Sequence, residues 1–195
     1  FQQWRGRESH FNRTTLQDEL IFAAMGLLIL AISLLVAFWT VRAFRRLAGS
    51  SSGQPLLIRH SILAALLLLN LGNLAGYGIV RWGDSVRFSN PPAIPSRMGE
   101  AGDLKLPHAI FLHGLQAIPL LGWYLSRKSS TPGAGLRRLY FGIAGYLGLA
   151  SYSIWQALAG RAPGDPDFFP AILLGVSLGL LLSAVFRPFP NPRPA

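Results

Sequence analysis

Long apolar stretches separated by short polar segments run through the whole chain. A helix needs about 20 consecutive apolar residues to cross a hydrocarbon core about 30 Å thick. The stretches lack the charged stripe of a helix on the surface of a soluble protein. The pattern therefore predicts an all-α fold, a transmembrane bundle of five helices. The five spans are expected at about residues 20–41, 56–80, 106–126, 139–159 and 168–186.

Polar residues before the first span predict where its helix begins. Thr14 with Gln17, or Thr15 with Asp18, has the spacing of a capping box. Either pair would start the helix near Leu16.

Prolines mark the turns of the chain. Pro107 suits the first turn of the third span, and Pro119 inside that span predicts a kink. The proline-containing 83–105 loop is expected to be extended on the outer surface. The 188–195 tail alternates proline with other residues and is expected to be flexible or polyproline II.

Acidic and basic residues are divided between the two faces of this bundle. The N-terminal segment, the 81–105 loop and the 161–167 loop carry all eight acidic residues of the chain. The opposite face, formed by 42–59, 127–138 and the tail, carries basic residues without acids. Short loops rich in Lys and Arg stay in the cytoplasm. The N-terminus is therefore predicted outside and the C-terminus in the cytoplasm.

The overall charge follows from this division. A formal net charge of +10 would suggest a nucleic-acid partner in a soluble protein. Here the basic loops account for it, with anionic membrane lipids as their expected neighbours, and nucleic-acid binding is not expected. The absence of cysteine excludes disulfides and thiolate metal sites.

The start of the chain leaves the predicted topology incomplete. Nothing before Leu20 resembles the hydrophobic region of a signal peptide. An N-terminus outside the membrane needs a segment that carries it there. We therefore expect at least one further hydrophobic span ahead of Phe1, with 1–195 forming a single transmembrane domain.

Four uncharged polar residues are expected near the middle of the membrane. At a rise of about 1.5 Å per residue, Asn70 and Gln116 lie near the centres of their spans, and Asn73 and His113 one turn further out. If these antiparallel spans are neighbours, Asn70 meets Gln116 and Asn73 meets His113. The cluster has two interpretations. It either forms structural hydrogen bonds between helices, or it is a ligand, metal or proton site.

The four histidines offer little support for a haem site. His60 lies at the cytoplasmic end, roughly 20 Å from the level of His113, and His108 lies at the outer end. A haem or chlorin held through a single histidine, completed by another subunit, is the route left open. His10, Asp103 and His108 form a second candidate site, on the outer face.

Signatures of common enzyme classes are missing from the sequence. It contains no His-Glu-x-x-His, no Gly-x-Ser-x-Gly, no phosphate loop and no dinucleotide fingerprint. Asp165-Pro166-Asp167 is interpreted as a turn and not as a catalytic carboxylate pair. The sequence therefore favours a role without catalysis.

Two motifs stand out in the chain. The first is Arg5-Gly6 followed by Ser9-His10-Phe11-Asn12-Arg13-Thr14-Thr15, then Phe22 and Met25-Gly26. The second is Gly102-Asp103-Leu104-Lys105, then His108, His113-Gly114-Leu115-Gln116 and Pro119-Leu120. Together they resemble a family of uncharacterised bacterial polytopic integral membrane proteins, whose members carry further hydrophobic spans ahead of the first motif. The resemblance implies a multi-pass protein of the bacterial inner membrane and brings no activity with it.

Two functional hypotheses follow, with a membrane-embedded enzyme ranked below both. The first is a non-catalytic accessory or packing subunit of a membrane complex, in contact with other membrane protein subunits and able to hold lipid, quinone or pigment. Glycines at helix-packing spacing, such as Gly72 with Gly76 and Gly175 with Gly179, favour it. The alternative is a small transporter or proton-conducting protein that works through the Asn, His and Gln cluster.

Overall fold

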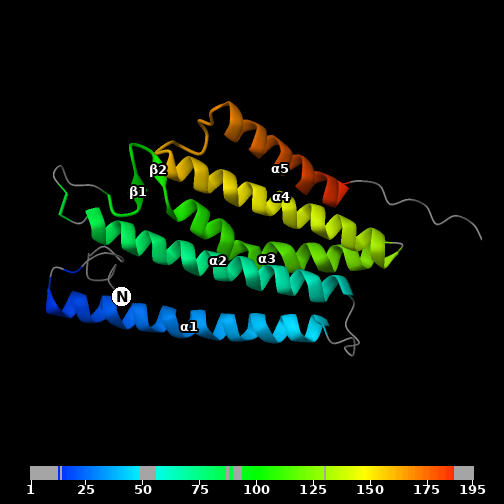
Figure 1. Ribbon diagram of the computed structural model, residues 1–195, viewed down its shortest axis with the longest axis horizontal. Helices are drawn as coiled ribbons and strands as arrows, with labels where there is room; N and C mark the ends of the chain where they lie inside the picture. Colours follow the sequence, from blue (N-terminus) through cyan, green and yellow to red (C-terminus); the bar gives the residue numbers. More distant parts are fainter. Residues whose placement is uncertain are drawn as a thin grey trace, which may run out of the picture.

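The protein is a row of antiparallel helices with a short hairpin at one end (Figure 1). The computed structural model describes residues 13, 15–48, 56–86, 88–89, 94–129 and 131–186. The elements in these ranges are α1 (Leu16–Ala48), α2 (Leu56–Val86), β1 (Arg97–Met98), β2 (Gly102–Asp103), α3 (Lys105–Lys128), α4 (Pro132–Leu158) and α5 (Phe168–Phe186).

Four of these helices, α1, α2, α3 and α5, are long and apolar enough to cross a membrane. The all-α prediction is confirmed, and the chain has the features of a multi-pass membrane protein. The predicted span 139–159 lies in α4 except for its last residue, and α4 is a 27-residue helix that is not among the four apolar candidates. Tyrosine, serine and glutamine residues lower its apolar content, so its crossing of the membrane stays a prediction.

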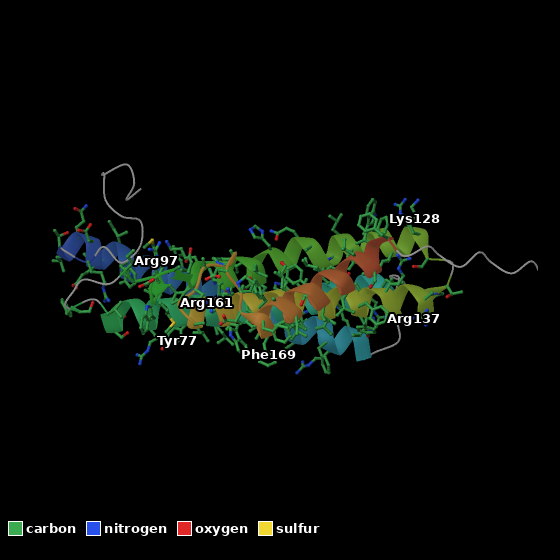
Figure 2. All side chains as sticks on the ribbon, turned by 90° about the horizontal axis from the view of Figure 1, so that it is seen from above. Tyr77, Arg97, Lys128, Arg137, Arg161 and Phe169 are labelled. Carbon is green, nitrogen blue, oxygen red and sulfur yellow. The ribbon has the colours of Figure 1, made fainter. Side chains whose placement is uncertain are left out.

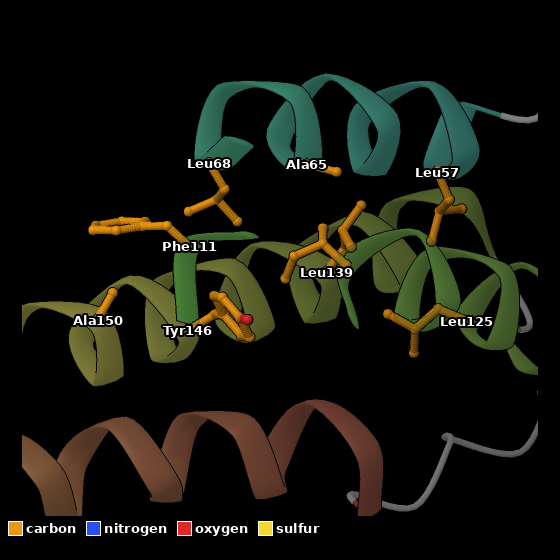
Figure 3. Close-up of a cluster of buried hydrophobic side chains, with 9 residues drawn as sticks. Leu57, Ala65, Leu68, Phe111, Leu125, Leu139, Tyr146 and Ala150 are labelled. Carbon is orange, nitrogen blue, oxygen red and sulfur yellow. The ribbon is translucent and has the colours of Figure 1, made fainter. Parts of the chain in front are cut away.

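The central helices α2, α3 and α4 pack against one another, while α1 lies outside against α2 and α5 outside against α4. The core between the central three contains Leu68, Phe111, Leu125, Leu139 and Tyr146 (Figure 3). Close approach between helices depends on residues without side chains. A Cβ at Gly114 would lie 2.8 Å from Leu68, for example. Glycine at this position therefore lets α2 and α3 pack closely.

Charged side chains gather at the two ends of the bundle. In Figure 2, Lys128 and Arg137 lie at one end, while Arg97 and Arg161 lie toward the other. This is the arrangement required if the long axes of the helices run across a membrane, because charges are costly within hydrocarbon.

The N-terminus of α1 has one of the two predicted caps. The Thr15 hydroxyl accepts a hydrogen bond from the Asp18 backbone N–H at 3.2 Å and donates one to the Asp18 carboxylate at 2.8 Å. The helix begins at Leu16, as the spacing predicted. Thr14 lies outside the described residues.

The predicted extended loop 83–105 is wrong at both ends, because residues 83–86 belong to α2 and residues 97–103 form a hairpin. An antiparallel hairpin pairs Arg97 with Asp103 and Met98 with Gly102. Gly99, at φ 56°, makes its turn, a conformation that glycine adopts without steric cost. Ala101 N–H donates to Gly160 O at 3.0 Å, and the Trp82 indole donates to Arg97 O at 2.9 Å. The hairpin is therefore bonded to the ends of both α2 and α4. Pro91 and Pro92 lie outside the described residues, as does the 188–195 tail.

Candidate functional site

Asn70 links α2 to α1 rather than to α3. Its side-chain amide donates to Thr40 Oγ1 at 2.8 Å and to Leu66 O at 2.7 Å.

Two further polar contacts hold α1 at other levels along its length. Arg13 pairs with Asp84 at 3.0 Å, and Arg59 donates to Arg46 O and Leu47 O at the end of α1. Among the described side chains of α1, Asp18 alone is buried. Polar contacts at three levels therefore position this outer helix.

Asn73 lies one helical turn from Asn70, and its side-chain nitrogen is buried without a hydrogen-bond partner among the described residues. A buried donor without an acceptor costs about 1–3 kcal/mol. The side-chain N–H donors of Asn73 thus have no acceptor among the described residues.

His108 provides the polar contact between α2 and α3. Its Nδ1 lies 2.8 Å from Gly72 O, so this nitrogen carries the proton and donates. The space for the ring exists because position 76 is glycine: a Cβ there would lie 2.8 Å from His108 Cε1. An imidazole that donates a hydrogen bond to the neighbouring helix in this way helps to hold the two helices together.

The structure describes two residues of the candidate outer-face site, His108 and Asp103, and their side chains make separate contacts. His108 is turned toward α2, while the Asp103 carboxylate is exposed and accepts the Lys105 backbone N–H at 2.9 Å. His10 lies outside the described residues. Within the ranges that are described, no three His, Cys, Asp or Glu side chains could hold a metal ion.

His113 and Gln116 lie on the outer face of α3, and both are exposed. The buried stripe of α3 contains Phe111, Gly114 and Ile118. At about 100° per residue, His113 is turned about 200° from Phe111, and Gln116 about 140°. In Figure 2, α3 forms one margin of the bundle. These two polar side chains therefore face whatever surrounds the protein.

The two predicted pairs, Asn70 with Gln116 and Asn73 with His113, do not form in the described chain. The condition for these pairs is met, because α2 and α3 are neighbours. No hydrogen bond in the described chain joins Asn70 to Gln116 or Asn73 to His113, because Asn70 bonds α1 and the two α3 residues face outward. Depth along a helix follows from the sequence, whereas rotation about its axis depends on packing.

His60, the remaining described histidine, bonds within its own helix. Its Nδ1 lies 2.9 Å from Leu56 O, and its ring contacts Tyr140 edge-on with ring centres 5.9 Å apart. It lies near the start of α2, far along the helix from Asn70. His60, His108 and His113 thus occupy separate levels and faces, with no two of them arranged to sandwich one iron.

Three polar residues that the sequence did not single out fix the ends of α4 and α5. Arg138 is buried and donates to Ala184 O and Val185 O, both at 3.1 Å, at the C-terminal end of α5. Buried Gln156 donates to Ala162 O and Asp165 O at the opposite end of α4, where the Tyr152 hydroxyl donates to Pro163 O. Thr131-Pro132 is a sequence signal for the start of a helix. This signal could have placed Arg138 inside α4 and not in the loop before it.

Asp165 and Asp167 both pair with Arg161 in the connection between α4 and α5. The hydrogen bonds that the Arg161 guanidinium donates to these carboxylates raise its pKa. The pairing agrees with the interpretation of this segment as a turn.

These observations define a multi-pass helical membrane protein with polar contacts between its helices and an uncovered polar face on α3. No protein-family model matches the chain, and no curated protein or solved structure matches it. The chain's own geometry therefore provides the evidence on function.

Proposed function

We propose that the protein is a non-catalytic packing subunit of a membrane complex in the bacterial inner membrane, with other membrane proteins and lipids as its partners. In this proposal α4 crosses the membrane as the fifth span. It runs beside α3 and α5, and its polar side chains are largely turned into these contacts. The N-terminus is outside and the basic loops are cytoplasmic, as the segregation of charge favours.

The observation that carries this proposal is the uncovered polar face of α3. Gln116 lies at the middle of a 24-residue helix, where surrounding lipid would be hydrocarbon. An amide or imidazole left without a hydrogen-bond partner in hydrocarbon costs several kcal/mol. Another protein placed against this face would supply donors and acceptors that lipid cannot.

The outer surface of α5 supports the same role. Gly175 and Gly179 have no atom of another residue near enough to touch an added Cβ, and both are exposed. Glycines four residues apart let two membrane helices approach closely. Residues of α3 pack against Gly72 and Gly76, whereas no described residue packs against Gly175 and Gly179. The second pair is therefore available to a helix of a partner.

A transporter or proton-conducting protein is the second candidate, favoured by the unused donor of Asn73. With His113 on the adjacent helix, this donor could belong to a polar path that opens in another conformation. Proton flux into vesicles that is abolished by His113→Leu would support this candidate. A lipid, quinone or pigment between the subunits is compatible with the first proposal, and an absorption spectrum of the purified protein tests for a pigment or a haem.

Photocrosslinking in native membranes tests the packing proposal. A photoreactive amino acid at position 116 should form protein adducts. The same residue at position 67 provides the control, because Leu67 is exposed and lies at a similar depth: its neighbour Leu68 packs at Gly114. Lipid adducts alone at both positions would contradict the proposal.

A further inference from the structure

The outward face of α3 carries a regular seam. Its members, Ala109, His113, Gln116, Leu120, Trp123 and Arg127, are spaced by four, three, four, three and four residues. All are exposed except Ala109, which is half-buried. Alternating steps of three and four are the spacing with which two helices pack knobs into holes along a left-handed coiled coil. No other described helix packs on this seam.

We propose that the seam binds the same seam of a second copy, forming a parallel dimer with its twofold axis along the membrane normal. This inference rests on the proposed packing function and names the partner. Two copies inserted in the same direction have parallel α3 helices, so each residue of the seam meets its own counterpart at the same depth. A second copy therefore places a polar partner at the membrane depth of each polar residue of the seam.

The polar side chains of the seam are complementary to themselves. A Gln116 amide offers two N–H donors and a carbonyl acceptor, so two of them can form reciprocal hydrogen bonds. A neutral His113 ring has one donor and one acceptor and can pair in the same way. Polar residues at seam positions also fix register, because a slip along the seam would separate both pairs. The dimer thus gives the exposed polar side chains of His113 and Gln116 a hydrogen-bond partner in the other copy.

The two ends of the seam are compatible with this arrangement. The guanidinium of Arg127 lies 5.5 Å from the centre of the Trp123 ring, in the last turn of α3, where lipid headgroups are expected. The like charges of two copies therefore lie at the level of water and anionic lipid, where repulsion is screened. Leu120 and Trp123 are apolar, and 63% and 50% exposed, and would pack between the polar pairs and this end.

Oxidative crosslinking tests the dimer cleanly because the chain contains no cysteine. The full chain is reconstituted in lipid vesicles at low protein density and oxidised with copper phenanthroline. Gln116→Cys and Leu120→Cys should form covalent dimers several-fold more efficiently than two controls. Leu115→Cys is the control on the same helix at the same depth, and Leu67→Cys is the control on α2, both at exposed positions.

The outcomes separate this inference from the proposed function. Equal crosslinking at seam and control positions would overturn the dimer. If, in addition, position 116 photocrosslinks to a different protein in native membranes, the packing function is retained with another partner. If it crosslinks to lipid alone, both proposals fail. A cysteine substitution that disturbs the polar pairs does not blur the result, because Leu120→Cys leaves His113 and Gln116 in place.

Discussion

Glycines on α2 show how single residues set the distance between membrane helices. Gly76 leaves room for the His108 ring, which reaches Gly72 O across the interface. Gly78, two residues further along the same helix, has open space around it. The two positions have the same residue type on the same helix and differ in whether a neighbour occupies the space of a side chain.

Replacing these glycines by alanine should give opposite results. Gly76→Ala places a methyl group 2.8 Å from His108 Cε1, and overpacking of this kind typically costs about 1–3 kcal/mol. Gly78→Ala should be neutral or stabilising by up to about 1 kcal/mol, since alanine has the higher helix propensity. Unfolding in mixed detergent micelles measures both. Equal stability of the two variants would show that His108 does not fill this space.

The identity of the polar residues could be predicted at the residue scale, but their directions could not. The sequence identified Asn70, His108, His113 and Gln116 as polar groups in or near the membrane. Which of them bond within the chain depends on the rotation of α2 and α3, which is set by the packing of Leu68, Phe111 and their neighbours. That packing is a property of several helices together and leaves no local signal in the sequence.

At the element scale, the C-terminal end of α5 depends on a residue from α4. The last carbonyls of a helix lack partners within it and attract positive charge. Arg138 donates to two of them, Ala184 O and Val185 O. A buried arginine in this position joins the starting end of α4 to the final turn of α5.

Removing that contact should loosen α5. Arg138→Ala is expected to lower the free energy of unfolding by roughly 1.5–3 kcal/mol, the range for hydrogen bonds to a charged group. The adjacent Arg137 is exposed, so Arg137→Ala is the matched control and should change stability by less than about 0.5 kcal/mol. Thermal unfolding in detergent provides the measurement. Similar losses of stability in both variants would mean that removal of a positive charge, and not loss of the hydrogen bonds from Arg138, lowers the stability.

The start of α1 was the boundary best predicted from local sequence, whereas the similar signal at the start of α4 was not used. Thr15 and Asp18 cap α1, and Thr131 caps α4 by accepting the Ala134 N–H at 3.3 Å. These signals act over one turn and need no tertiary contact. The hairpin at 97–103 was not predicted, because it is held by the distant residues Trp82 and Gly160. Local signals in that loop, above all its prolines, favoured an extended chain.

At the scale of the whole molecule, the helices alternate in direction and bring the basic connections to one end. Lys128 and Arg137 lie at this end (Figure 2). The opposite end holds the hairpin and the loop between α4 and α5, whose acids include Asp103, Asp165 and Asp167. This division of charge supports the proposed orientation, with the basic end in the cytoplasm.

Single cysteines test that orientation. An impermeant thiol reagent added to intact cells should label Ser89→Cys, next to the end of α2, and should leave Ser51→Cys unlabelled until the cells are opened. Ser51 lies outside the described residues and is used here as a position in the connection between α1 and α2. Labelling of Ser51→Cys and protection of Ser89→Cys in intact cells would invert the topology.

The packing proposal is tested most directly by what surrounds α3 in the membrane. A nitroxide attached to Gln116→Cys reports contact with lipid through its collisions with oxygen, which dissolves in hydrocarbon, and Leu67→Cys provides a lipid-facing reference at a similar depth. If another protein covers α3, the label at position 116 should have several-fold lower oxygen accessibility than the label at position 67. Equal, high accessibility at both positions would place the polar face of α3 in lipid and contradict the account.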